Sequence, residues 1–347
     1  MVIYPLLLSS IYKEMIWGSE SWDISCRPDE MCLVENGPAA GMSIENYINQ
    51  DKENVLGTRL AHMDRFPLLV KIIDAKDKLS VQVHPDDCYF SGFTPKNNPG
   101  GWHAADTGKS EMWYILTPPT DGRLIIGLKP DITPELLRQA CENGTVEDCL
   151  NHLYVKAGDI INIPPGLIHA LTSGVRVAEV QQNSDITFRL YDYNRIGLDG
   201  NPRQLHVDET IAVTDFSNKI PKVAVPGLNI IKGNCSMVYA IANEHFAVIK
   251  YELTGEHEEV SDPAAFCIYT CVEGDVEVAS CDLSAGKSIF IPAGLGLYTM
   301  RPRSGNSCVL LKSFVPDIQE DFISPLQHHG YTKAEIAKHT MISSYQQ

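Results

Sequence analysis

Two side chains that could bind a metal ion lie two residues apart in the segment 79–87. The segment alternates apolar and polar residues up to the step His84-Pro85, which predicts a strand that ends at the proline. On a strand, Gln82 and His84 project from the same face. An imidazole beside an amide oxygen is half of a metal site, although a polar strand face that only meets water is the simpler interpretation of the pair alone.

Two further candidate ligands stand downstream. Glu111 begins the apolar run of a strand predicted over 109–116, where a solvent-facing carboxylate at a strand end is the alternative. The segment 158–169 contains a Gly-Asp turn, an apolar strand and a Pro-Pro-Gly turn that delivers His169 to the next strand. Two nitrogens and two oxygens suit Zn²⁺, with Mn²⁺, Fe²⁺ and Co²⁺ as substitutes. One carboxylate leaves such a site with a charge of about +1, and a fifth ligand would suit a Lewis-acid role.

The segment 179–195 is the densest polar stretch of the chain, and it contains Arg189 and Arg195. Two guanidinium groups in an acidic protein favour an anion site. The alternative is a structural ion pair of Arg189 with Asp185 or Asp192.

The elements around these residues are mostly strands. The apolar run 66–74 predicts a strand buried on both faces. A small helical insert over 131–150 separates two strand-rich blocks, with Thr133 as N-cap, Pro134 at the first helical position and a break at Gly144. A second short helix is expected over 145–150.

The turn pattern of 158–169 returns 128 residues later at 286–297, with Leu297 where His169 stood. This pattern resembles the second motif of the cupin family, which implies two jelly-roll β-barrels. We therefore expect a mainly β chain with a catalytic, metal-binding cupin domain over 1–130 and 151–215, and a cupin-like domain without metal ligands over 226–347. In the second block, 271–278 indicates a hairpin with Gly-Asp at its turn.

Composition limits the partners of the 347-residue chain. A net charge of −16 argues against nucleic acids and anionic membrane surfaces. The ten cysteines form no CxxC pair, which is typical of reduced thiols in an intracellular, here cytoplasmic, protein. Residues 1–10 have neither the basic start of a signal peptide nor the length of a membrane span.

A more specific resemblance covers most of the chain. It rests on the segments 13–18, 66–87, 108–114, 164–171 and 183–195. Together they resemble type I mannose-6-phosphate isomerase in its short bacterial form. The resemblance implies that Gln82, His84, Glu111 and His169 bind one zinc ion. It also implies that Arg189 is catalytic and that Lys109 lines the site. Ser19 stands where the family usually has a second glycine after Trp17-Gly18, outside the ligand set.

The implied reaction interconverts mannose 6-phosphate and fructose 6-phosphate by moving a proton between C2 and C1 through an enediol. Lys109, Ser110 and Arg195 are candidates for phosphate or hydroxyl contacts, and Trp17 and Glu179 join the substrate-binding candidates. Lys109, Glu179 and a metal-bound water remain alternatives for the base.

Two other hypotheses remain open: another cupin enzyme, such as a different sugar-phosphate isomerase or an oxygenase, and a non-catalytic hexose-phosphate-binding relative. A monomer and a homodimer are both compatible with the sequence.

Overall fold

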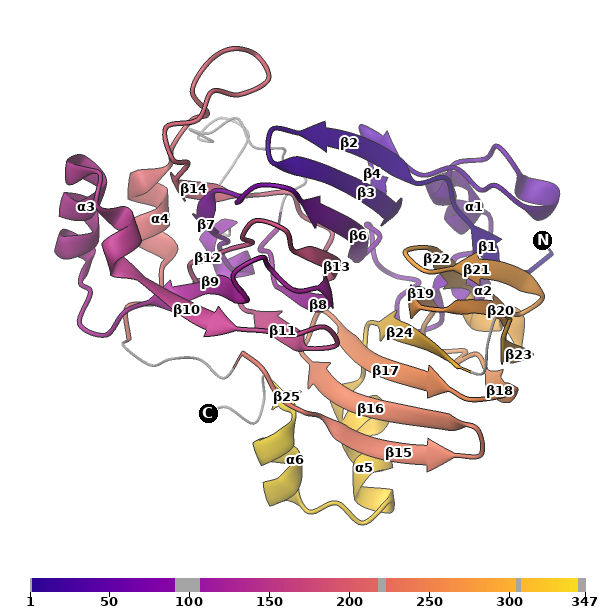
Figure 1. The fold of residues 1–347 in the computed structure, drawn as a ribbon. Helices are drawn as coiled ribbons and strands as arrows, with labels where there is room; N and C mark the ends of the chain where they lie inside the picture. The colour runs from indigo at the N-terminus through magenta and orange to yellow at the C-terminus, as the bar shows by residue number, and fades with distance from the viewer. Residues whose placement is uncertain (1, 91–106, 218–222, 304–306, 343–347) are drawn as a thin grey trace. The chain divides into compact units, whose positions relative to one another are not determined.

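The computed structural model describes residues 2–90, 107–217, 223–303 and 307–342 (Figure 1). The chain is mainly β, as its alternating patterns predict. It forms two compact units. The central unit comprises Tyr12–Glu20 and Ile72–Val223, and the terminal unit comprises Met1–Ile11, Ser21–Lys71 and Ala224–Gln347. The chain crosses between the units within β3 (Gly18–Ile24) and β6 (Leu68–Ala75).

One five-stranded sheet of the central unit carries most of the predicted site. Its strands, in spatial order, are β10 (Leu150–Tyr154), β9 (Arg123–Leu128), β12 (His169–Ala170), β7 (Val81–Val83) and β14 (Phe188–Tyr191). All of its neighbouring strands are antiparallel.

A six-stranded sheet includes strands of the same unit. Its order is β11 (Ile160–Ile163), β8 (Glu111–Thr117), β13 (Arg176–Gln182), β6, β3 and β2 (Ile11–Met15). Strand β6 is buried along nearly its whole length, which confirms the prediction for 66–74.

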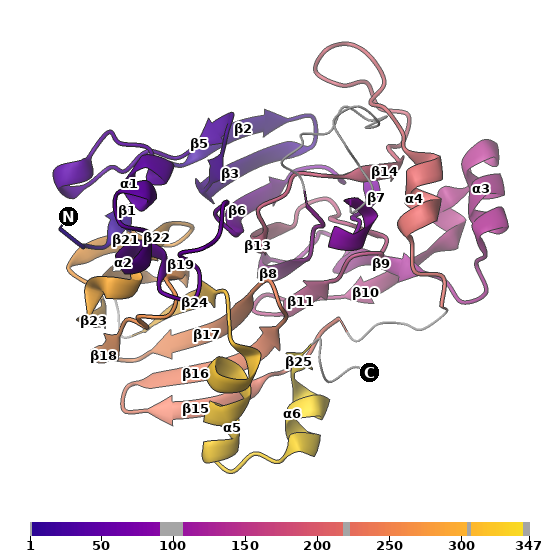
Figure 2. The same cartoon turned by 180° about the vertical axis from the view of Figure 1, so that it is seen from behind.

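The helical insert is present in part. Helix α3 (Pro134–Asn143) begins where predicted, because the Thr133 side chain accepts a hydrogen bond from the Leu136 backbone, and it ends at Gly144 in the left-handed region. The second short helix is present as a single 3₁₀ turn over Val146–Cys149, and it ends there because Leu150 already begins β10 and pairs with β9. Both views place α3 beside α4 (Val207–Val213) (Figures 1 and 2).

The terminal unit is built from two larger sheets and a small ribbon. The eight-stranded sheet has the order β1 (Leu6–Leu7), β22 (Ser288–Ile291), β19 (Cys267–Glu273), β24 (Cys308–Phe314), β17 (Ala247–Leu253), β16 (Cys235–Ala242) and β15 (Leu228–Lys232), with β25 (Met341–Ile342) also paired to β16. The four-stranded sheet has the order β18 (His257–Val260), β23 (Leu297–Pro302), β20 (Asp275–Val278) and β21 (Cys281–Ser284). The ribbon pairs β4 (Cys26–Arg27) with β5 (Glu30–Met31).

The helices of the terminal unit are short. They are α1 (Ile44–Gln50), α2 (Lys52–Leu56), α5 (Ser324–His328) and α6 (Lys333–His339), with a six-residue π-helical segment over Ile318–Ile323. Within the described ranges, no helix is long and apolar enough to span a membrane.

The predicted hairpin over 271–278 is not formed. Strand β19 pairs with β22 and β24, whereas β20 pairs with β21 and β23, so the two strands enter different sheets. Gly274 lies between them with φ of +75°, and a Cβ there would lie 2.9 Å from the Ser307 carbonyl oxygen. Gly274 therefore lets the chain pass from one sheet into the other, and it does not form a tight hairpin turn.

Candidate metal centre and active site

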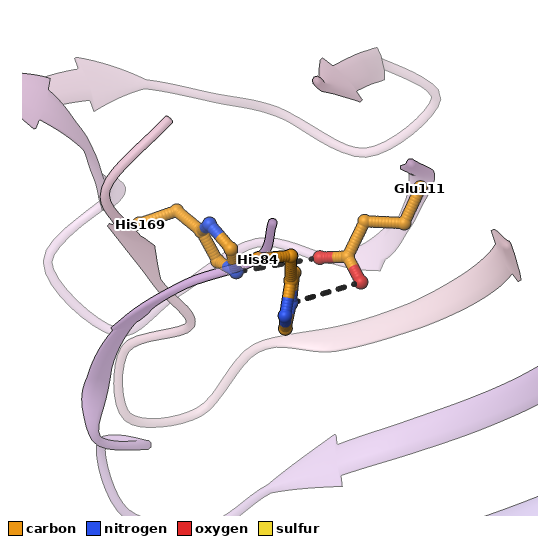
Figure 3. A group of neighbouring side chains, drawn as sticks. All are labelled: His84, Glu111 and His169. Atoms are coloured by element: carbon orange, nitrogen blue, oxygen red, sulfur yellow. Dashed lines mark ion pairs between the residues drawn. The ribbon is translucent and has the colours of Figure 1, made fainter. Parts of the chain in front are cut away.

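Three buried side chains from three strand ends converge inside the central unit (Figure 3). His84 follows β7, Glu111 begins β8 and His169 begins β12. His84 Nε2 lies 3.4 Å from Glu111 Oε2, and His169 Nε2 lies 3.4 Å from Glu111 Oε1. Each side chain points toward the others, and each residue is at most 1% exposed. Three of the four predicted ligands thus surround one point.

Strand pairing and one tight turn produce this convergence. His169 pairs directly with Gln82 across β12 and β7. The turn before His169 is tied to the first histidine, since the Gly166 amide donates to the His84 carbonyl at 2.9 Å. Gly166 has φ of +81°, and a Cβ there would lie 3.0 Å from the Val213 carbonyl oxygen. The Pro-Pro-Gly turn is therefore required to place His169 beside His84.

Gln82, the fourth predicted ligand, lies alongside the group. Its amide nitrogen is 3.4 Å from His169 Nε2, and its amide oxygen is 3.4 Å from the Ser80 hydroxyl. A half-turn of the amide exchanges these two atoms and brings the oxygen toward His169. Gln82 is within reach of the group, and its role as a ligand remains a prediction.

Backbone carbonyls fix the tautomers of both histidines. His84 Nδ1 lies 2.7 Å from the Ile186 carbonyl oxygen, and His169 Nδ1 lies 2.8 Å from that of Leu167. A proton on each Nδ1 leaves each Nε2 lone pair directed at Glu111, which is the usual arrangement of metal-binding imidazoles. Burial lowers the pKa of His84 to about 3, with further lowering by Lys109, and burial also lowers the pKa of His169. Both rings are therefore neutral near pH 7.

Glu111 is ionised despite its burial. Burial alone would raise the pKa of this carboxyl group, but the positive charge of Lys109 is the largest of the effects that together outweigh burial and hold the pKa well below its ordinary value. The Lys109 ammonium lies 3.0 Å from Glu111 Oε2, and both side chains are at most 5% exposed. Lys109 therefore belongs to the same buried group as the three predicted ligands.

The donor atoms of this group fit a divalent metal ion. One donor atom from each of His84, Glu111 and His169 lies within 4.8 Å of the others. His84 Nε2 and Glu111 Oε1 are buried and form no hydrogen bond within the described part of the chain, whereas Glu111 Oε2 faces the Lys109 ammonium. Buried polar atoms are rarely left in this state unless a cation or an ordered water completes them. The group could therefore hold a metal ion through two nitrogens and a carboxylate.

The predicted arginines have different partners. Arg189 Nε lies 3.3 Å from the Ser80 hydroxyl, and its Nη1 donates to the Gln204 carbonyl at 2.9 Å. Burial, followed by repulsion from Arg203, lowers the pKa of Arg189 to about 10. Because the Ser80 hydroxyl also contacts the Gln82 amide oxygen, Ser80 links the Arg189 guanidinium to a predicted metal ligand.

Asp192 is held by two other arginines. It pairs with Arg195 at 2.5 Å and also with Arg203. Among the described residues Arg189 forms no ion pair, so the alternative of a structural pair with Asp185 or Asp192 is wrong for Arg189. The structural ion pair with Asp192 is instead formed by Arg195.

The remaining predicted residues lie in the supporting layer of the site. The Ser110 backbone amide donates to the Gln182 side chain at 2.7 Å, between Lys109 and Glu111. Glu179 accepts a hydrogen bond from the Trp113 indole at 2.8 Å and is buried.

Trp17 lies in the turn between β2 and β3. It is 3% exposed and packs in the hydrophobic core with residues such as Ile73 and Leu171. Its predicted role in substrate binding has no support from this position and stays a prediction.

Sequence reasoning missed several residues. Trp113 packs edge-on against the His169 ring at a centroid distance of 5.4 Å. Ser80 joins Arg189 to Gln82, and Arg203 neutralises Asp192. A signal existed for two of them: Ser80 lies two residues before Gln82, just ahead of β7, and Trp113 lies two residues after Glu111 on the same face of β8.

A mainly β chain in which two histidines and a glutamate from two different sheets form a group that could hold a metal ion fits the cupin class. The chain matches the model of the cupin domain of mannose-6-phosphate isomerase over residues 236–310. It also matches the catalytic domain of type I phosphomannose isomerase over residues 7–121, which includes His84 and Glu111. The chain belongs to the type I mannose-6-phosphate isomerase family, whose enzymes are aldose-ketose isomerases.

Its relatives match along most of their length. The probable mannose-6-phosphate isomerase GmuF of Bacillus subtilis is 33% identical over 86% of this chain and 96% of its own. The mannose-6-phosphate isomerase of Streptococcus mutans is 32% identical over 72% of this chain and 79% of its own. The crystal structure of a Bacillus subtilis mannose 6-phosphate isomerase superposes with a TM-score of 0.77 at 28% identity, covering 89% of this chain and 99% of that one.

Proposed function

We propose that this protein interconverts D-mannose 6-phosphate and D-fructose 6-phosphate at the group formed by His84, Glu111, His169 and Lys109. The single observation that carries the proposal is the geometry of this group: two neutral imidazoles and an ionised, buried carboxylate face one point. The named activity of the relatives supports the same assignment. Substrate, metal and mechanism are parts of this proposal.

We propose Gln82, His84, Glu111 and His169 as ligands of one zinc ion, with Mn²⁺, Fe²⁺ or Co²⁺ as substitutes. A bound divalent ion would polarise the sugar oxygens at C1 and C2 and stabilise the negative charge that develops on them. Burial of the group excludes water, which strengthens such electrostatic effects.

The protein's own residues then have separate tasks. Arg189 stabilises the anionic enediolate or an adjacent phosphate oxygen, since it lies near Gln82 through Ser80 and has no carboxylate partner among the described residues. Lys109, which lies beside Glu111, is our candidate for moving the proton between C2 and C1, a step for which its ammonium must first give up a proton; Glu179 is instead held by Trp113. Ser110 and Arg195 remain candidates for hydroxyl or phosphate contacts.

We also propose that the two strand-rich blocks are cupin-type jelly rolls, the first catalytic (1–130 and 151–215, interrupted by the insert) and the second (226–347) without metal ligands. The match of residues 236–310 to a cupin-domain model supports the second assignment. A cytoplasmic location, and action on small molecules as a monomer or homodimer, stay predictions.

The test is turnover of mannose 6-phosphate in an assay coupled to fructose 6-phosphate formation. We expect chelation to abolish turnover and Zn²⁺ to restore it, with Mn²⁺, Fe²⁺ and Co²⁺ tested in parallel. Turnover that survives complete metal removal would contradict the ligand assignment. A metal-loaded protein that binds mannose 6-phosphate but does not exchange its C2 proton with solvent would be a binding protein instead of an isomerase.

Arg189→Ala separates catalysis from assembly of the site. We expect a loss of turnover of at least about 100-fold, as for removal of one group that stabilises an oxyanion. Metal content and unfolding temperature should match the wild type. The matched control is Arg176→Ala, since Arg176 is exposed on β13 of the same unit. Normal turnover of the Arg189 variant would remove its catalytic role.

A further inference from the structure

The terminal unit contains a second group of polar side chains on the inner faces of its sheets. We call it the Lys312 cluster. Its members are Tyr251 on β17, His257 and Glu259 on β18, Tyr269 on β19, Tyr298 on β23, and Lys312 and Phe314 on β24. None of these residues takes part in the metal candidate group, which belongs to the central unit.

Lys312 occupies a position that the strand pattern assigns to the core. On β24 it shares a face with Cys308, Leu310 and Phe314, all of which are buried members of the terminal unit's core. It pairs with Tyr269 on the neighbouring strand β19. Placing an ammonium group among apolar side chains costs free energy unless that group is paired. A lysine here therefore requires an explanation.

No described residue satisfies the Lys312 ammonium closely. Nζ lies 5.7 Å from the Tyr251 ring centroid and 5.9 Å from those of Tyr269 and Phe314. Elsewhere in the chain a lysine, Lys78, approaches a tyrosine ring to 3.5 Å. The nearest carboxylate oxygen, on Glu259, is 3.9 Å away, and no described group accepts a hydrogen bond from Nζ. The ammonium is therefore held apart from its neighbours.

Solvent reaches this cluster. The Lys312 side chain is 19% exposed and that of Glu259 is 22% exposed, whereas Tyr251, Tyr269 and Tyr298 are at most 7% exposed. Small polar molecules can thus approach the charged atoms while the aromatic rings remain largely covered. This combination of a few accessible polar groups and apolar walls is typical of small-molecule sites.

The hydrogen-bonding groups of the cluster include both signs. Glu259 Oε2 accepts a hydrogen bond from the Tyr251 hydroxyl at 2.9 Å and lies 3.9 Å from His257 Nε2. The Tyr269 and Tyr298 hydroxyls are 3.0 Å apart. Burial raises the pKa of all three tyrosines above the ordinary value, so their hydroxyls remain protonated donors at neutral pH.

We propose that the Lys312 cluster binds a small, uncharged polyhydroxy compound such as a monosaccharide. An anion would meet the Glu259 carboxylate beside Lys312, and a cation would meet the ammonium. Sugar hydroxyls both donate and accept, so neighbouring hydroxyls satisfy Lys312 and Glu259 together. The rings of Tyr251, Tyr269 and Phe314 supply apolar surface for the C–H face of a sugar.

The test uses the full-length protein with chelator present, so that the metal site is empty of metal, and D-mannose as the probe. Saturation-transfer NMR reports which protons of the sugar contact the protein. We expect transfer from the wild type, a reduction of at least tenfold in affinity in Lys312→Met and a smaller reduction in Tyr269→Phe. Metal-restored isomerase turnover should not change in either variant.

Lys250→Met is the matched control. Lys250 lies on β17, its side chain is also 19% exposed, and it forms an ion pair with Glu252. This control should bind the sugar like the wild type. Absence of transfer from the wild type would overturn the proposal, since the cluster then holds water only. Unchanged binding by Lys312→Met, or binding lost instead in His84→Gln, would also overturn it by placing the sugar elsewhere.

Discussion

Lys109→Met should destabilise the metal-free protein, and the free energy of protonating Glu111 sets an upper limit on the loss. The Lys109 ammonium lies 3.0 Å from Glu111 Oε2 in a buried environment. At an effective dielectric constant of about 20, their attraction is about 5 kcal/mol. Without the ammonium, Glu111 can escape ionisation by taking up a proton. From the ordinary glutamate pKa of 4.5, this protonation costs about 3 kcal/mol at pH 7. We therefore expect a loss of about 3 kcal/mol in the free energy of unfolding at pH 7.

The same reasoning fixes the pH dependence of this loss. Because the pKa of folded Glu111 is held below 4.5, the stability it contributes is present above that pH and is lost as the pH falls through the folded pKa. In the variant, protonating the buried carboxyl group becomes easier as the pH approaches 4.5. The difference between variant and wild type should therefore shrink to about 1 kcal/mol at pH 5.5. A bound metal ion supplies the missing positive charge, so metal should also reduce the difference.

Urea unfolding at pH 7 and pH 5.5, with chelator and then with Zn²⁺, measures these changes. The control is Lys129→Met, since Lys129 is exposed in the same unit and its ammonium donates to the Asp148 backbone carbonyl, with no carboxylate partner among the described residues. A difference for Lys109→Met that is the same at both pH values, or one no larger than that of the control, would refute the assignment of Lys109 as the counter-charge of Glu111.

Three further outcomes follow from local geometry. Gly108→Ala places a Cβ 2.4 Å from the Asp86 backbone, so the start of β8 must shift; we expect reduced turnover in a protein with an unchanged circular dichroism spectrum. Because burial keeps His84 and His169 neutral, the unfolded chain binds more protons below pH 6.5. The metal-free protein should then lose about 1 kcal/mol of stability from His84 between pH 6.5 and 5.5, and a further amount of at most that size from His169, measured by urea unfolding; a flat profile would contradict their burial as neutral rings. Thr332→Ala removes the capping box of α6 and should cost about 1 kcal/mol; an unchanged unfolding midpoint would show that α6 contributes little to the measured transition.

Local rules in the sequence determined much of this protein. The proline after His84 marks the end of one strand, and the Pro-Pro-Gly turn before His169 marks the start of another. Both histidines could therefore be placed at strand ends from the sequence and predicted as ligands. Helix α3 follows from Thr133 and Gly144, and β6 from an unbroken apolar run. Each of these features depends on residues within a few positions of one another.

Only the tertiary structure decided which side chains far apart in the sequence contact each other. Asp192 pairs with Arg195 and Arg203 and leaves Arg189 to Ser80, because β14 lies beside β7. Lys312 looks in the sequence like one polar residue within a strand, and only the pairing of β24 with β17 and β19 places it among tyrosines. Strand pairing joins residues far apart in the chain, and local sequence preferences carry no information about which strands will meet.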